Sequence, residues 1–279
     1  LIEKYLGIEN NDSIVKLSSF PPLTLNGNLS IQGNSRLEDL SELNKINLPH
    51  SLDVIIRNNK SLVNLKGLEN NSLKDLSGLK NLRSVSVDFR IILNESLQNL
   101  NGLESLDSIY DKMNIIFNHR LKNLEGIESI KYLNNITINT NDSLSSLKGL
   151  DKLKAIHGSL VITSNISLVN LKHLDSLKTL GLLYIRNNNR LKNLKGLTSL
   201  DSIYTGISIG SADSLKDLSG MPSLSYIGQT VSVGDNISLQ SLEGLEKINT
   251  LDMLTIGTNP RLKNLKGLKN LKNSKNIFI

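Results

Sequence analysis

Hydrophobic and polar residues alternate along this chain in one short pattern that returns throughout its length. The pattern reads L-x-I-x-x-N-x-x-L-x-x-L-x-G-L, and complete copies follow one another every 23 or 24 residues. The alternating apolar pair before the asparagine is typical of a short strand with one buried face. The later leucines, three residues apart, leave too few residues for an α-helix and favour a second short strand or a 3₁₀ turn.

Ten copies of the alternating pair predict ten strands. The pairs are Leu29/Ile31, Val54/Ile56, Phe89/Ile91, Met113/Ile115, Ile136/Ile138, Leu160/Ile162, Leu183/Ile185, Ile207/Ile209, Val231/Val233 and Leu254/Ile256. A period of this length indicates stacked coils that share one core. We therefore predict a mainly β, leucine-rich solenoid of about ten coils over residues 29–279, with one prominent parallel sheet. A shortened coil is expected near 69–82, where L-K-D-L-S-G-L recurs without its own strand or asparagine.

The asparagine of the pattern is its most regular polar position. The column contains Asn34, Asn59, Asn94, Asn118, Asn141, Asn165, Asn188, Asn236 and Asn259. Only Ala212 interrupts it. A turn that leaves a strand has free backbone N–H and C=O groups, which an inward amide can satisfy in its own coil and in the next. We predict a buried structural ladder and consider a ligand site at these asparagines the weaker alternative.

A glycine column follows the asparagines. It contains Gly67, Gly78, Gly102, Gly126, Gly149, Gly196, Gly220, Gly244 and Gly267. Glycine at a corner between two faces predicts a positive φ. Glu42 and His173 take the glycine position in two coils, and we expect His173 to be an exposed corner residue and not a catalyst.

The two ends of the chain depart from the repeat. We predict an N-terminal cap over residues 1–28, and its apolar residues have a roughly helical spacing that ends before Pro21-Pro22. These residues are Leu1, Tyr5, Leu6 and Ile8. At the other end, Ile277 and Ile279 resemble the core pair of one more strand, so further domains beyond Ile279 are expected.

Composition narrows the functional classes. The chain has 54 Leu and 36 Asn among 279 residues, and so much leucine needs a core, which argues against disorder. The net charge of +6 is a mild excess without a run of five basic residues, and aromatics are only 4%, so nucleic acid is not an expected partner. Without cysteine there is no disulfide or thiolate site. No apolar stretch is long enough for membrane insertion.

Catalytic chemistry has little support in the sequence. Polysaccharide-active β-helix enzymes need clustered carboxylates or a basic residue on one face. The outward strand positions carry no Asp or Glu, and Asp235 lies nearby but alone. The histidines fall at unrelated positions of the repeat: His50, His119, His157 and His173. We therefore expect no enzyme, no catalytic residue, no metal and no cofactor.

Two groups of outward residues are candidate ligand-binding sites. The first joins neighbouring coils and contains Val161, Tyr184 and Arg186. Tyrosine and arginine are common interface anchors. The second is apolar where most other coils are polar, and it contains Ile92, Leu93, Ile116 and Phe117. An exposed apolar patch can mark an interface; alternatively, these residues cover a local irregularity beside the shortened coil.

Charged residues form two further columns near the glycines. One contains Lys148, Lys172 and Lys195, and the other contains Glu104, Glu128, Asp151 and Asp175. The spacing predicts local pairs Lys148–Asp151 and Lys172–Asp175. Exposed pairs contribute about 0–1 kcal/mol to stability. We interpret these columns as a solvated face.

With these motifs in place, the chain from Leu29 to Ile279 resembles the receptor L-domain family. The sharpest matches are I-H-G-S-L-V-I-T-S-N over residues 156–165 and I-G-Q-T-V-S-V-G-D-N over residues 227–236. The resemblance implies a right-handed β-helix-like solenoid at the cell surface or outside the cell. It also implies a recognition or adhesion module for a protein or glycan. The absence of cysteine departs from the animal receptors and favours a microbial or protist surface protein. A structural spacer is the alternative function, and a polysaccharide-active enzyme is the weakest.

Overall fold

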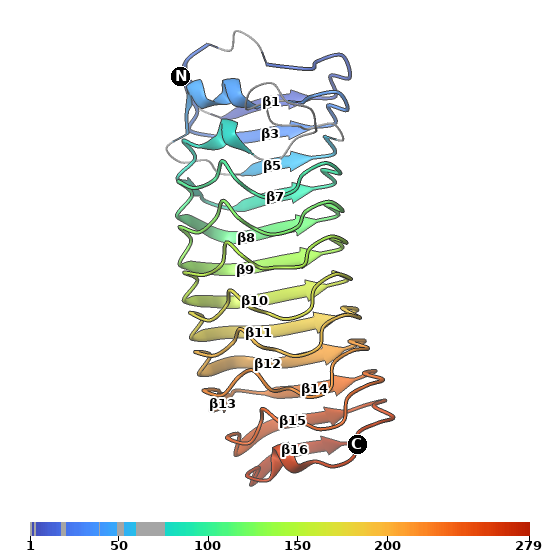
Figure 1. The fold of residues 1–279 in the computed structure, drawn as a ribbon. Helices are drawn as coiled ribbons and strands as arrows, with labels where there is room; N and C mark the ends of the chain where they lie inside the picture. Colours follow the sequence, from blue (N-terminus) through green and yellow to red (C-terminus); the bar gives the residue numbers. More distant parts are fainter. Residues whose placement is uncertain (1, 3, 18–20, 39, 49–52, 60–75) are drawn as a thin grey trace.

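The computed structural model shows an elongated stack of coils whose strands run in one direction (Figure 1). It describes residues 2, 4–17, 21–38, 40–48, 53–59 and 76–279. The coils contribute strands to a single parallel sheet of fourteen strands, and the first and last strands lie at opposite ends of the stack. The predicted mainly β solenoid of about ten coils is confirmed.

The strands are short and follow one another regularly. In chain order they are β1 Tyr5–Glu9, β2 Leu23–Thr24, β3 Asn28–Gln32, β4 Ile46–Asn47, β5 Val54–Arg57, β6 Ser84–Val85, β7 Asp88–Ile92, β8 Ser108–Ile116, β9 Tyr132–Asn139, β10 Ala155–Thr163, β11 Thr179–Arg186, β12 Ser202–Gly210, β13 Tyr226–Ile227, β14 Thr230–Gly234, β15 Thr250–Ile256 and β16 Asn273–Phe278. Three 3₁₀ helices are η1 Ser41–Lys45, η2 Ser77–Leu79 and η3 Lys266–Leu268. Strands β2 and β4 form a separate two-stranded ribbon.

Neighbouring coils are stacked in register, so equivalent residues lie side by side. Leu160 of β10 is opposite Ile136 of β9 and Leu183 of β11. The side chains of all ten predicted pairs point inward and are at most 4% exposed. Each such burial stabilises the fold by about 1.5–3 kcal/mol. The alternating pattern thus supplies the core and leaves the residues between the pairs on the outer face of the sheet.

Strand β5 is hydrogen-bonded directly to β7, with Val54 opposite Phe89 and Ile56 opposite Ile91. This pairing agrees with a coil between them that has no strand of its own in the main path of the sheet. Of the shortened coil predicted near 69–82, residues 69–75 lie outside the described residues. The remainder contains η2.

The helical interpretation of the first 28 residues is wrong. Strand β1 lies there and pairs in register with β3, which places Leu6 and Ile8 beside the first predicted core pair. The backbone N–H of Asn11 donates to Oδ1 of Asn34 at 3.0 Å. Leu6, Ile8 and Asn11 therefore satisfy L-x-I-x-x-N, and the repeat begins one coil earlier than predicted.

The glycine corners have the positive φ that the sequence predicts in six coils. These are Gly102, Gly126, Gly149, Gly196, Gly220 and Gly244, with φ between 104° and 123°. Gly78 and Gly267 differ because they lie in η2 and η3 and have no positive φ. Gly67 lies outside the described residues. His173 occupies its corner with φ 78°, a smaller angle that accommodates its side chain.

The asparagine column forms a ladder of hydrogen bonds inside the turns. Oδ1 of Asn141 accepts from the backbone N–H of Asn118 at 3.0 Å. Nδ2 of Asn141 donates to the carbonyls of Ile115 at 3.0 Å and Asn139 at 3.2 Å. The nine column members have side chains buried in this way, and consecutive rungs lie 23 or 24 residues apart from Asn94 to Asn188. The ladder therefore satisfies backbone groups that the turns would otherwise bury without partners.

The ladder is interrupted at two positions. In the described part of the chain, Oδ1 of Asn94 has no hydrogen-bond partner; its coil follows the shortened one. At the second position, Ala212 donates its backbone N–H to Oδ1 of Asn236 at 3.1 Å but offers no acceptor to the preceding rung. The N–H of Asn188 consequently meets no acceptor in the described part of the chain.

Replacement of Ala212 with asparagine is expected to raise the free energy of unfolding by about 1–2 kcal/mol. The new amide would accept from the N–H of Asn188 and donate to the carbonyl of Ile185, and each net hydrogen bond contributes about 0.5–1.5 kcal/mol. Urea unfolding measures the change as a higher midpoint at an unchanged slope. Ala212→Leu is the control, because it fills the site without an amide and should not stabilise. An Ala212→Asn variant no more stable than the parent would contradict the expectation.

Candidate recognition surface

The first candidate group lies on the outer face of β10 and β11. Val161 and Tyr184 are direct neighbours in the register, and Arg186 is opposite Thr163. Val161 and Tyr184 are partly buried, whereas Arg186 is exposed. The structure therefore brings the three predicted residues together on adjacent strands, where a paired backbone fixes their spacing.

Arg186 extends along the stack across one whole coil. Its guanidinium lies 3.1 Å from Oδ2 of Asp235, and the two side chains are 46% and 52% exposed. Gly210, the register neighbour of Arg186, lies beneath this bridge; a Cβ there would be 3.7 Å from Nε of Arg186. The partner of Asp235 is thus an arginine, which the sequence columns did not indicate. An ion pair this exposed contributes about 0–1 kcal/mol to stability, so its main effect is to orient the guanidinium.

From β12 to β15 the column of Tyr184 carries small residues, and Phe278 of β16 follows them. Ser208, Ser232 and Thr255 continue the column of Tyr184. Gly234 and Gly257 follow Gly210, and a Cβ built on either would meet only the other's backbone, at 3.6 and 3.5 Å. The backbone is therefore less covered at Gly234 and Gly257 than at Gly210, which is buried beside Arg186. We call Val161, Tyr184, Arg186, Asp235 and Gly210 the strand-face cluster.

The second candidate group is also assembled by the register. Ile92 of β7 lies opposite Ile116 of β8, and the N–H of Leu93 donates to the carbonyl of Ile116 at 3.0 Å. Phe117 is 39% exposed, and its ring lies 6.2 Å from that of His119. The other three residues are partly buried.

Leu93 and Phe117 place apolar side chains in a backbone conformation that their equivalents share. Both have positive φ, 59° and 58°, at the turn position before the ladder asparagine. In the other coils with a positive φ here, the residue is Gly, Asn, Thr, Ser or Asp. A bulky residue in this conformation costs about 1–3 kcal/mol, a cost that functional sites often carry. These two coils therefore differ from the others in the apolar side chain at this position and not in the backbone.

Four exposed tyrosines were not anticipated from the sequence. They are Tyr110, Tyr132, Tyr204 and Tyr226, each more than half exposed where a strand begins. Tyr204 and Tyr226 have ring centroids 6.4 Å apart. Tyr110 and Tyr132 line a hollow of about 280 Å³ together with His157. The signal was present as tyrosine next to the isoleucine or leucine that opens a strand, outside the columns considered for binding.

The predicted local pairing of the charge columns is wrong. Lys148 contacts Glu125 of the preceding coil, and Asp151 lies 2.7 Å from Nδ1 of His173 in the following one. Burial raises the pKa of Asp151, but hydrogen bonds from His173 and from the N–H of Gly149 outweigh it and leave that pKa below its ordinary value. Both contacts join neighbouring coils, which the parallel sheet holds about 4.8 Å apart.

Within the described ranges, no group of three or more His, Asp or Glu side chains is placed to hold a metal ion. His119 contacts Asp142 at 2.8 Å, and His50 lies outside the described residues. Among the described residues, no helix is both long and apolar enough to span a bilayer.

Comparisons with known proteins add no identification. No protein-family pattern matches the chain, and no curated protein sequence matches it significantly.

Proposed function

We propose that this chain is a non-enzymatic recognition or adhesion module that binds a protein or glycan through the strand-face cluster. The observation that carries the proposal is the Arg186–Asp235 bridge, which holds a guanidinium beside Tyr184 and over the buried Gly210. Rigid strands position side chains more reproducibly than loops do. Tyrosine and arginine supply a large contact area and several hydrogen-bond donors to a ligand.

The apolar pair Leu93 and Phe117 is a second observation that supports a recognition function. Leu93 and Phe117 hold unfavourable backbone conformations at positions where other coils place small or polar residues. Large exposed apolar patches on soluble proteins commonly mark contact surfaces. We assign these residues, with Ile92 and Ile116, to a separate contact region nearer the N-terminal end of the stack.

The type of surface protein and its location are proposed from the resemblance to the receptor L-domain family. The solenoid is compatible with the L-domain motifs, and similarity to that family supports a place at the cell surface or outside the cell, in a microbial or protist surface protein. A spacer that only organises other domains is the alternative function. A polysaccharide-active enzyme has less support, because the carboxylate of the strand-face cluster, Asp235, is paired with Arg186.

A screen of the purified protein against glycan and protein arrays tests the proposal. We expect saturable binding to one ligand class. The double variant Tyr184→Ala with Arg186→Ala should weaken that binding at least about tenfold, since truncating two anchors removes more than about 1.4 kcal/mol. The affinity of each variant is measured by biolayer interferometry.

The control variant is Tyr132→Ala with Arg120→Ala, which removes the same residue types away from the cluster and should bind like the parent. Equal loss in both variants would remove the strand-face cluster from the proposal. Absence of any ligand would favour the spacer, and cleavage of a polysaccharide by the pure protein would favour the enzyme.

A further inference from the structure

The glycine corners carry a second repeated hydrogen bond, distinct from the asparagine ladder. In five coils the corner residue donates its backbone N–H to the carboxylate two residues ahead. The pairs are Gly102–Glu104 at 2.8 Å, Gly126–Glu128 at 3.0 Å, Gly149–Asp151 at 3.0 Å, His173–Asp175 at 3.2 Å and Gly244–Glu246 at 2.9 Å. An acidic side chain thus occupies the space in front of the corner N–H in each of these coils.

Two adjacent coils lack this carboxylate. Their corners are Gly196 and Gly220, with φ of 119° and 123°, close to the values of the paired corners. The residue two ahead is Thr198 in one coil and Pro222 in the other. The N–H groups of both glycines meet no acceptor in the described part of the chain. Thr198 instead directs its hydroxyl to Oδ1 of Asp175, at 3.1 Å.

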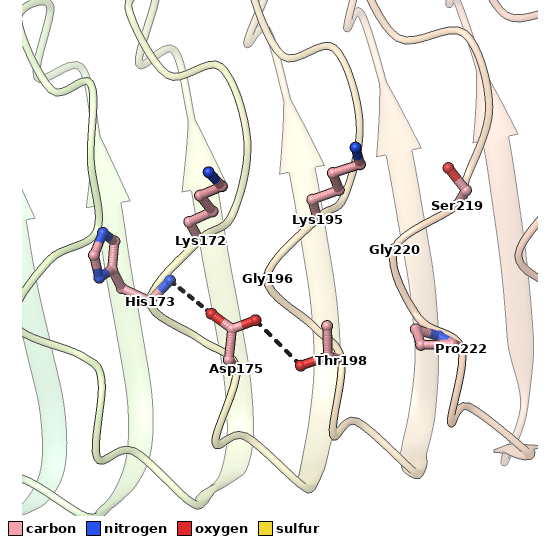
Figure 2. A pocket seen from close by; sticks show the side chains of 9 residues that line it. All are labelled: Lys172, His173, Asp175, Lys195, Gly196, Thr198, Ser219, Gly220 and Pro222. Atoms are coloured by element: carbon pink, nitrogen blue, oxygen red, sulfur yellow. Dashed lines mark hydrogen bonds between the residues drawn. The ribbon is translucent and has the colours of Figure 1, made fainter.

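These unpaired donors face a hollow with a positive margin. The hollow is about 540 Å³ and is lined by Lys172, Lys195, Gly196, Thr198, Gly220 and Pro222, among others. Figure 2 shows the two lysines side by side on successive coils, above the row of corner residues. Within the described residues neither lysine forms an ion pair, in contrast to Lys148, which contacts Glu125. A neighbouring hollow adds Lys192 and Lys216 beside Lys195.

We propose that Gly196 and Gly220 form a binding site for carboxylate side chains of an acidic peptide segment in a partner protein. The same N–H groups in five other coils already bind Asp or Glu, so the fitting group is the one that the chain itself supplies elsewhere. Coils are about 4.8 Å apart, which places two such carboxylates next to each other. Lys172 and Lys195 supply complementary charge and guide the encounter.

The one carboxylate lining this hollow does not fill the site. Asp175 accepts from the N–H of His173 and from the hydroxyl of Thr198, which keeps it at its own corner. It therefore marks the edge of the site, and the peptide lies over Gly196 and Gly220. This corner is separate from the strand-face cluster, so the two proposals stand or fall independently.

The test uses a labelled peptide of alternating Glu and Ser, followed by fluorescence anisotropy at low salt. We expect binding that salt weakens, and none for the matched Gln and Ser peptide. Thr198→Asp restores the G-x-D arrangement and should weaken binding about tenfold or more, because the internal carboxylate takes the N–H of Gly196. Pro222→Asp should do the same at Gly220. Asn114→Asp, which adds the same charge on the strand face, should retain parental affinity.

Amide nuclear magnetic resonance provides a second readout. Titration with the Glu peptide should shift the backbone N–H signals of Gly196 and Gly220, and the Thr198→Asp variant should show the Gly196 shift without peptide. Equal loss of affinity in Asn114→Asp, or no shift at either glycine, would overturn the site. Binding of polygalacturonate without binding of the Glu peptide would overturn the peptide assignment in favour of an acidic glycan.

Discussion

Replacement of Asn141 with alanine is expected to lower the free energy of unfolding by about 3–5 kcal/mol. The change removes the acceptor for the N–H of Asn118, in the turn after β8, and the donor for the carbonyl of Ile115, within β8. Each buried group left without a partner costs about 1–3 kcal/mol. Urea unfolding monitored by circular dichroism measures the loss as a lower midpoint.

The matched control is Asn189→Ala, which truncates an exposed asparagine one residue after a ladder rung. Its side chain makes no ladder contact, and the change should stay within about 0.5 kcal/mol. The native alanine at position 212 shows that the backbone can turn without the amide, so loss of hydrogen bonds and not misfolding explains the difference. A loss below 1 kcal/mol for Asn141→Ala would contradict the structural ladder.

Replacement of Gly149 with alanine is expected to destabilise the fold by at least about 3 kcal/mol. Its φ of 113° is strained for any residue with a Cβ, and that Cβ would lie 2.0 Å from the carbonyl oxygen of Leu124 in the preceding coil. The backbone strain and the steric clash both destabilise the variant, because the backbone of the neighbouring coil cannot move without shifting the stack. Thermal unfolding followed by circular dichroism should show a clearly lower midpoint.

Gly257→Ala is the comparison for this glycine. A Cβ there would meet only Gly234, at 3.5 Å, and the position has no positive φ. The thermal unfolding midpoint of Gly257→Ala should stay close to that of the parent protein. If both variants lost the same stability, the cost would come from losing glycine anywhere in the repeat and not from the corner geometry.

The sequence predicted the stack because the repeat encodes it locally. Each alternating pair, such as Leu160 and Ile162, is buried, and the register follows from the constant spacing. The first coil was missed although Leu6, Ile8 and Asn11 keep the pattern, because the following glycine corner is absent from that stretch and a helical spacing competed. In this single incomplete coil, the helical spacing of the apolar residues outweighed the match to the repeat.

The candidate sites were less predictable, because they depend on contacts between coils. Tyr184 and Arg186 could be placed on one face by counting positions. The reach of Arg186 across a coil to Asp235 depends on the small residue at Gly210. The free N–H groups of Gly196 and Gly220 could not be predicted, because the sequence does not show that the acids at the other corners accept hydrogen bonds from the backbone.

The ladder of asparagines also has a direction. Each rung donates its N–H to Oδ1 of the next, so the bonds form a polarised chain along the solenoid axis. The missing bonds at Asn94 and Ala212 divide this chain into three blocks. In a stack whose stability is a sum over neighbouring coils, cooperativity is weakest where the coupling between coils is weakest. The two interruptions are therefore natural boundaries between segments that open separately, and the coils between them form the segment that opens last.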